Sequence, residues 1–153
     1  MNVVRYVQLR REVEYLCSAA LDTAGELDRC EPEAEEAPYL AQALIHLSLK
    51  ISYLLWRFGR RITDRYGAAE AERLRSLLGL DDASPLAPGG VSPLVELITM
   101  PDHELIGAFR YDSLSIQAGG ALRPLRPLVP ALEQICARLG ATATQETTLA
   151  ARV

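Results

Sequence analysis

The sequence has none of the short motifs that mark the common catalytic and phosphate-binding sites. It contains no G-x-S-x-G, no G-x-x-x-x-G-K-S/T, no G-x-G-x-x-G and no H-E-x-x-H. Its glycine pairs, at 89–90 and 119–120, favour turns and not a phosphate-binding loop. We therefore expect no catalytic residues and a protein that is not an enzyme. A site assembled in space from distant residues would leave no such motif, and this alternative stays open.

Histidine and cysteine are also scarce. There are two histidines and three cysteines, no C-x-x-C, and no glutamate followed by a histidine three residues later. These absences argue against a zinc site and against a carboxylate metal site between helices. An odd number of cysteines argues against a disulfide framework. We expect no metal and no cofactor, and we expect Cys17, Cys30 and Cys136 to be free thiols that are structurally independent of one another.

Lysine and long apolar runs are missing as well. Lys50 is the only lysine among 16 basic residues, so arginine supplies almost all of the positive charge. The most apolar window, residues 43–56, contains His46 and Lys50 and is too short to cross a bilayer. Arg5 and Arg10 interrupt any export-signal pattern near the N-terminus. We expect no membrane partner and a cytoplasmic location.

The composition is that of an ordinary globular protein. The 153 residues are 49% apolar and 24% charged, which fits one folded domain and argues against disorder. The formal net charge is −4, so nothing in the total demands a polyanionic partner. The charge is unevenly distributed, because the chain is acidic up to residue 37, basic over 38–80 and acidic again afterwards.

The first helix is predicted by apolar residues at spacings of three and four. Its stripe comprises Tyr6, Leu9, Val13, Leu16, Ala20, Thr23 and Leu27. This spacing places the side chains on one face of a helix over about 3–29. Such a face usually packs into a bundle. An acidic connector with two prolines follows the helix.

The second helix is predicted over about 38–66, from Pro38 in its first turn to Gly67 as its stop. It has two apolar stripes. The first comprises Leu40, Leu44, Leu47, Ile51, Leu54, Phe58 and Ile62, and the second Ile45, Leu49, Tyr53 and Trp56. A helix that is apolar on most sides is buried on most sides. We expect it to be the central helix or to lie in a subunit interface.

Shorter elements are expected after the second helix. A helix is predicted over 68–78, and it could instead continue the second helix through a bend near Gly67. The composition of 81–90 indicates a loop. Pro93 and Pro101 each fit the first turn of a further helix, the second of which should end near the glycine pair at 119–120. No segment alternates in the way that predicts a strand.

A last helix is expected over about 127–139. The predicted fold class is therefore all-α, a helical bundle of two long helices, about 3–29 and 38–66, with three or four shorter helices. Residues 1–140 should form a single helical domain. Residues 141–153 are small, Thr-rich and aperiodic, which indicates a flexible C-terminal tail.

An arginine cluster is the first candidate binding feature. It comprises Arg57, Arg60, Arg61 and Arg65 near the end of the second helix. Arginines grouped in this way can contact the phosphates of a nucleic acid or an acidic partner. The alternative interpretation is that cations simply favour the C-terminal end of a helix. Acids of the connector, from another chain or from a loop, could also pair with them.

A second candidate lies in the stretch that begins at Pro101. Were this stretch helical, His103, Glu104, Arg110 and Tyr111 would surround the small residues Gly107 and Ala108. The resulting notch could bind a partner side chain or a small polar ligand. The alternative is that the small residues let another helix approach closely while the polar groups face water.

These patterns predict a non-catalytic helical interaction module, either a homo-oligomer or a small subunit of a larger protein assembly. The stripe of the first helix and the two apolar stripes of the second motivate this expectation. The partner would be another protein or a second copy of the chain. One alternative is a nucleic-acid-binding helical subunit that uses the arginine cluster, although the net charge does not favour it. The other is an enzyme with a spatially assembled site.

Overall fold

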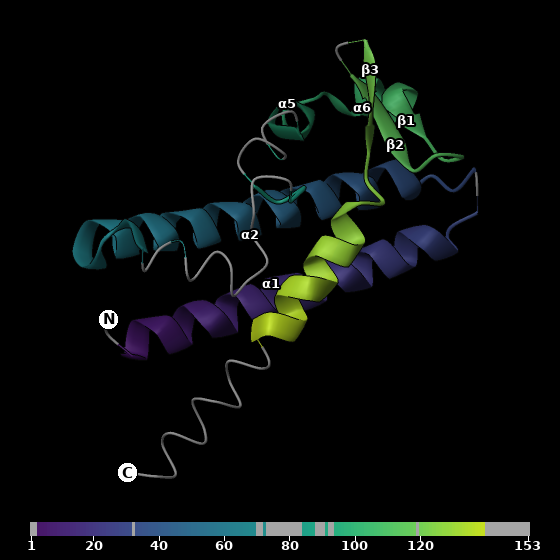
Figure 1. Ribbon diagram of the computed structural model, residues 1–153. Helices are drawn as coiled ribbons and strands as arrows, with labels where there is room; N and C mark the ends of the chain where they lie inside the picture. The colour runs from purple at the N-terminus through teal and green to yellow at the C-terminus, as the bar shows by residue number, and fades with distance from the viewer. Residues whose placement is uncertain are drawn as a thin grey trace.

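Two long antiparallel helices form the frame of the protein (Figure 1). Helix α1 spans Val3–Arg29 and α2 spans Ala37–Tyr66, so the two long helices predicted from the sequence are confirmed. The computed structural model describes residues 3–31, 33–69, 72, 84–87, 91, 94–118 and 120–139.

Residues that the sequence singled out set both ends of α2. Pro38 lies in the first turn, where its missing N–H has no helical acceptor to lose. Gly67 has a φ of 96°, which L side chains rarely adopt, and its N–H donates to the carbonyl oxygen of Thr63. The helix therefore ends at Tyr66, just before the predicted stop.

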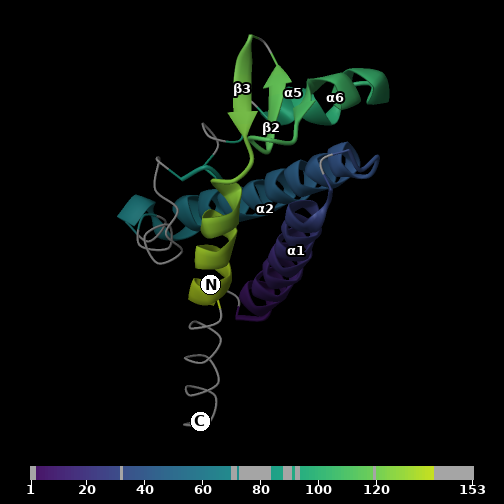
Figure 2. The same ribbon diagram turned by 90° about the vertical axis from the view of Figure 1, so that its right-hand side faces the viewer.

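Short elements follow α2 and lie on its side of the helical hairpin (Figure 2). They are α5 (Val95–Ile98), α6 (Asp102–Ala108), β1 (Phe109–Arg110), β2 (Ser115–Ala118) and β3 (Ala121–Pro124). The strands form an antiparallel sheet in the order β1-β2-β3, in which Ile116 is opposite both Phe109 and Arg123. Residues 128–139 form the C-terminal helix, as predicted for the last helix.

The sheet corrects the all-α prediction, which holds only as a description of a mostly helical chain. The helix that begins after Pro101 ends at Ala108 and does not reach the glycine pair, because Phe109 is extended with ψ of 133°. Gly120 instead lies between β2 and β3 with a φ of 77°, a conformation suited to a hairpin turn. Ile116 of the central strand β2 is fully buried. The strand therefore forms because Ile116 packs into the core, although its local sequence pattern is weak.

One core joins the two halves of the chain. Its largest fully buried side chains are Leu27, Leu44, Ile45, Ile51, Leu86, Leu97, Leu105, Ile116, Leu125, Leu128, Leu132 and Ile135. They come from α1, α2, the short elements, the C-terminal helix and two connecting segments, which contribute Leu86 and Leu125, so each layer buries its apolar face against another.

Several sequence predictions fall wholly or partly outside the described residues. These are most of the helix over 68–78, part of the loop over 81–90, the start of a helix at Pro93, and the tail over 141–153. Within the described part of the chain, no helix combines the length and apolarity needed to cross a membrane.

The central position of α2 predicts how truncations along it will behave. Ile51 is fully buried, whereas Leu54, which the sequence placed in the same stripe, is only half-buried. We expect Ile51→Ala to lower the free energy of unfolding by about 2–5 kcal/mol, because it leaves a cavity. Leu54→Ala should cost clearly less. Urea unfolding measures both, and an equal or larger cost at Leu54 would contradict this arrangement.

Candidate functional site

One side of α2 remains exposed after the helix has packed. Its residues are spaced alternately three and four apart, and all are exposed except Ala43, which is half-buried. We call this row the α2 stripe. It comprises Glu36, Tyr39, Ala43, His46, Lys50, Tyr53, Arg57 and Arg60. This spacing keeps the side chains on one face, which lies opposite the buried Ile51 and Leu55.

Tyr53 departs from the first of the two expectations for α2, that of a central helix buried on most sides, and leaves the second, a subunit interface, as a prediction. Ile45 is buried, Leu49 is half-buried, and Tyr53 is 61% exposed. A step of four residues exceeds one helical turn by about 40°, so two such steps rotate the row out of the core. The sequence analysis counted Tyr53 in the second apolar stripe, and the structure places it on the surface.

A groove of about 1120 Å³ lies between α2 and α5, beside the α2 stripe. We call it the α2–α5 groove. Tyr53, Trp56, Arg57 and Arg60 line it from α2, and Val95 and Ile98 line it from α5. Asp64 contributes a carboxylate. The groove thus has an apolar wall facing aromatic rings and two guanidinium groups.

A buried hydrogen bond holds the floor of this groove. The Ser52 hydroxyl on α2 donates to the Leu86 carbonyl oxygen at 2.6 Å, and both residues are buried. The Leu86 N–H in turn donates to the Ser84 hydroxyl oxygen at 3.2 Å. A buried hydroxyl without a hydrogen-bond partner costs free energy, because it has lost its contacts with water. The bond to Leu86 removes this cost for Ser52. The segment over 84–87 is therefore fixed against α2.

The structure brings two of the four predicted arginines together at the groove. Arg57 and Arg60 are exposed there, and the guanidinium carbon of Arg57 lies 5.9 Å from the centre of the Tyr53 ring. That distance is within the range of a cation–π contact. Arg61 and Arg65 belong to α2, but their side chains are outside the described residues.

The second predicted site does not have the helical geometry on which it was based. His103 and Glu104 are exposed on α6, whereas Arg110 lies in β1 and Tyr111 in the turn after it. Because α6 ends at Ala108, the four residues do not share adjacent faces of one helix. A side chain placed at Gly107 would meet open space in the described part of the chain, so no close helix contact forms there either.

Arg110 and Tyr111 have structural partners. The Arg110 guanidinium donates to the Gly107 carbonyl oxygen at 2.6 Å and to the Gln117 side-chain oxygen at 2.9 Å, which links β1 to α6 and β2. The Tyr111 hydroxyl donates to the Cys30 carbonyl oxygen at the end of α1. This bond connects the sheet to the turn between the long helices.

The three cysteines are free thiols, as predicted, but two of them lie in contact and are therefore not structurally independent. Cys17 of α1 is buried and forms a side-chain hydrogen bond with Cys136 of the C-terminal helix. Burial, and then the neighbouring Cys136, raise the pKa of the Cys17 thiol far above its ordinary value. Burial also raises the pKa of Cys136, and the hydrogen bond with Cys17 opposes that rise.

A second groove, of about 640 Å³, lies between α1 and the C-terminal helix. Leu21, Leu27 and Val129 contribute to its apolar lining. Arg126 and Asp28 also line it and approach to 4.0 Å, but both side chains are largely exposed, so this ion pair contributes little to stability.

No protein family model matches the chain, and neither a curated protein nor a solved structure matches it. In the described part of the chain, no group of three or more His, Cys, Asp and Glu residues is placed to hold a metal ion. The exposed surface of α2 beside the α2–α5 groove is the candidate functional site.

The contact between Tyr111 and Cys30 predicts a structural role for this tyrosine. Tyr111→Phe should lower the free energy of unfolding by about 0.5–1.5 kcal/mol, because the Cys30 carbonyl oxygen loses its donor. Glu104→Ala, at an exposed position on α6, should leave stability unchanged. Thermal unfolding measures both variants. Unchanged stability in Tyr111→Phe, together with loss of a binding activity, would instead support the predicted ligand site.

The Cys17 thiol predicts a loss of stability at alkaline pH. Its pKa is raised in the folded protein, so above the unfolded value of about 8.5 the unfolded chain loses a proton that the folded chain keeps. The free energy of unfolding should therefore fall as the pH rises, by about 1.4 kcal/mol per pH unit for this group. Urea titrations between pH 7 and 10 measure the slope. Cys17→Ala should show a shallower slope, and an identical slope would contradict the assignment.

Proposed function

We propose that the chain is a non-catalytic interaction module that binds a segment of a protein in the α2–α5 groove. One observation carries the proposal, namely that Tyr53, Trp56, Arg57 and Arg60 line one groove. Tryptophan, tyrosine and arginine are the residue types enriched among the hot spots of protein interfaces. Their clustering around an apolar wall is typical of an interface core with a polar rim.

The chemistry of the groove also indicates the character of its partner. Val95, which is 48% exposed, and the half-buried Ile98 form a wall that an apolar side chain would cover. Arg57 and Arg60 lie on the other side and favour a carboxylate. A segment that carries both acidic and apolar side chains therefore fits best. Although the whole chain has a net charge of −4, the local positive charge of Arg57 and Arg60 would orient such a partner on approach.

A nucleic-acid-binding subunit remains the alternative. Arg57 and Arg60 could contact phosphates, and Tyr53 could stack on a base. The apolar wall at Val95 and Ile98 and the carboxylate of Asp64 favour a protein partner instead. Binding of a fluorescent oligonucleotide at low salt tests the alternative, since phosphate contacts weaken steeply as salt increases. We expect weak binding or none.

Photo-crosslinking from inside the groove tests the proposal directly. We would place p-benzoylphenylalanine at Val95 or at Tyr53 and irradiate intact cells of the native host. We expect adducts with a polypeptide from both positions, because both side chains line the groove and are exposed. Position 106 is the matched control, since Ile106 on α6 is 52% exposed and is not part of the groove lining.

The outcomes of the crosslinking separate the proposals. Adducts at 95 and 53 that disappear when Arg57→Glu and Arg60→Glu are added would support a protein-binding groove. Equal labelling at 106 would show nonspecific collision, and no polypeptide adduct at any position would overturn the proposal. Adducts with nucleic acid would favour the alternative function.

A further inference from the structure

The α2 stripe has the spacing of a helix-pairing surface but has no partner helix among the described residues. Alternation of three and four residues is the spacing by which two helices pack along a continuous seam. The row from Glu36 to Arg60 extends for roughly 36 Å at about 1.5 Å per residue. Tyr39 and Tyr53 are 43% and 61% exposed along it. Such a row of exposed aromatic and charged side chains on one helix face can bind a second helix.

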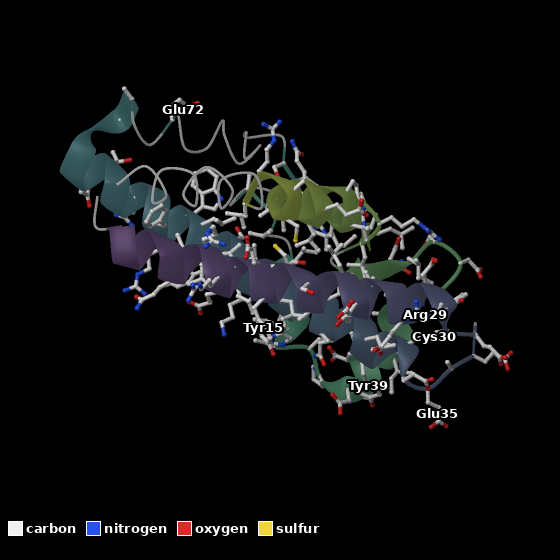
Figure 3. The ribbon with its side chains drawn as sticks, turned by 90° about the horizontal axis from the view of Figure 1, so that it is seen from below. Tyr15, Arg29, Cys30, Glu35, Tyr39 and Glu72 are labelled. Atoms are coloured by element: carbon white, nitrogen blue, oxygen red, sulfur yellow. The ribbon has the colours of Figure 1, made fainter. Side chains whose placement is uncertain are left out.

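Charge is separated along this row. The turn before α2 carries the exposed acids Glu31, Glu33, Glu35 and Glu36. Figure 3 shows Glu35 and Tyr39 at the end of the hairpin where α1 meets α2, and Glu72 at the opposite end. Arg57 and Arg60 are near that opposite end of α2. Because α2 separates Glu36 from Arg60 by roughly 36 Å, the two cannot pair within one chain.

We propose that a second copy of this chain packs antiparallel along the α2 stripe. The inference rests on the proposed function and identifies its partner. In the antiparallel arrangement, four pairs of opposed residues occur twice each through a twofold axis. These pairs are Glu36 with Arg60, Tyr39 with Arg57, Ala43 with Tyr53, and His46 with Lys50. A twofold arrangement of this kind is closed, so it gives a dimer and not a filament.

Each of the first three pairs is physically favourable. Glu36 and Arg60 have opposite charges. Tyr39 opposite Arg57 repeats the contact that Tyr53 already makes with Arg57 inside one chain at 5.9 Å. Ala43 is small, and this leaves room for the ring of Tyr53 from the other copy. The pair of His46 with Lys50, next to the axis, adds no attraction, so recognition comes from the two ends.

Other alignments of the same stripe are less favourable. A parallel arrangement places Glu36 against Glu36 and Arg60 against Arg60. An antiparallel shift of seven residues in one direction places Arg57 against His46 and leaves Glu36 beyond the last cation. The opposite shift leaves Arg57 and Arg60 without facing side chains on the stripe. The parallel arrangement is disfavoured because like charges face each other, and the shifted arrangements because some charged side chains face no opposite charge. The charge pattern therefore selects one register.

The proposed pairing also occupies the edge of the α2–α5 groove. Tyr53, Arg57 and Arg60 belong both to the stripe and to the groove lining. The second copy brings Tyr39 and Glu36, one aromatic ring and one carboxylate, to these three residues. This is the combination of apolar and acidic chemistry that the groove favours.

Charge reversal with rescue tests the register. Light scattering over a range of concentrations should show a dimer for the wild-type chain. Glu36→Arg alone, and Arg60→Glu alone, should each weaken dimerisation roughly tenfold or more, because like charges then meet at two symmetry-related contacts. An equimolar mixture of these two variants should form a heterodimer, since both contacts again join opposite charges. A single chain carrying both substitutions should form homodimers.

Matched controls come from α1. Glu12→Arg and Arg11→Glu make the same charge changes at exposed positions away from the stripe, and they should remain dimeric. Circular dichroism of every variant checks that helix content is unchanged. A wild-type chain that is monomeric at all concentrations, single variants that dimerise normally, or a mixture without heterodimers would each overturn the proposal.

The test also separates this inference from the proposed function. A monomeric chain that still crosslinks from position 95 to a different protein would overturn self-pairing and leave the interaction module intact. A crosslinked adduct with the mass of two chains, lost in both single variants and recovered in their mixture, would support both. A monomer without any polypeptide adduct would overturn both.

Discussion

Burial of α2 on two sides is the constraint on which the rest of the structure depends. One side packs against α1, and Leu44, Ile45 and Ile51 are almost completely buried. A second side receives α5 and the segment over 84–87, which the Ser52–Leu86 hydrogen bond fixes in place. The C-terminal helix also lies close to α2, since Leu44 lines one groove together with Leu125 and Val129. The α2 stripe stays largely exposed, and the groove forms where its C-terminal part meets α5.

The small sheet is bonded to the acidic end of the helical hairpin. Tyr111 follows β1 directly, and its hydroxyl donates to the carbonyl oxygen of Cys30, the first residue after α1. Arg110 ties the same strand to α6 and β2. These bonds hold the beginning of the acidic turn against a paired strand, so its carboxylates project from an anchored segment. Fixed charges bind a partner at a smaller entropic cost than charges on a free loop.

The sequence predicted the long helices well, because both have strong apolar periodicity and α2 has Pro38 and Gly67 at its ends. It failed for the sheet, where short strands leave a weak pattern and where burial of Ile116 depends on residues far away in the chain. For the candidate site, arginine clustering pointed to four residues, and two of them, Arg57 and Arg60, line the groove. The spacing of four residues places Tyr53 beside Arg57 and Trp56 beside Arg60 on the predicted helix. The sequence could not show the opposite wall, because the groove exists only once α5 packs against α2.

The helix dipole explains only part of why Arg57 and Arg60 lie in the C-terminal half of α2. Cations near the C-terminal end of a helix gain about 0.3–1 kcal/mol each from the helix dipole, and the effect is confined to the last turn. Arg57 and Arg60 stand before the last turn of α2, which ends at Tyr66, so the dipole favours them little. Nor does it explain Tyr53, whose exposed ring lies under a guanidinium at 5.9 Å. Tyr53 and Arg57 are four residues apart on one helix, and this spacing by itself brings the two side chains together. In the proposed dimer, the acidic turn of the other copy would supply the complementary charge, because the length of α2 keeps the acids and the arginines of one chain roughly 36 Å apart.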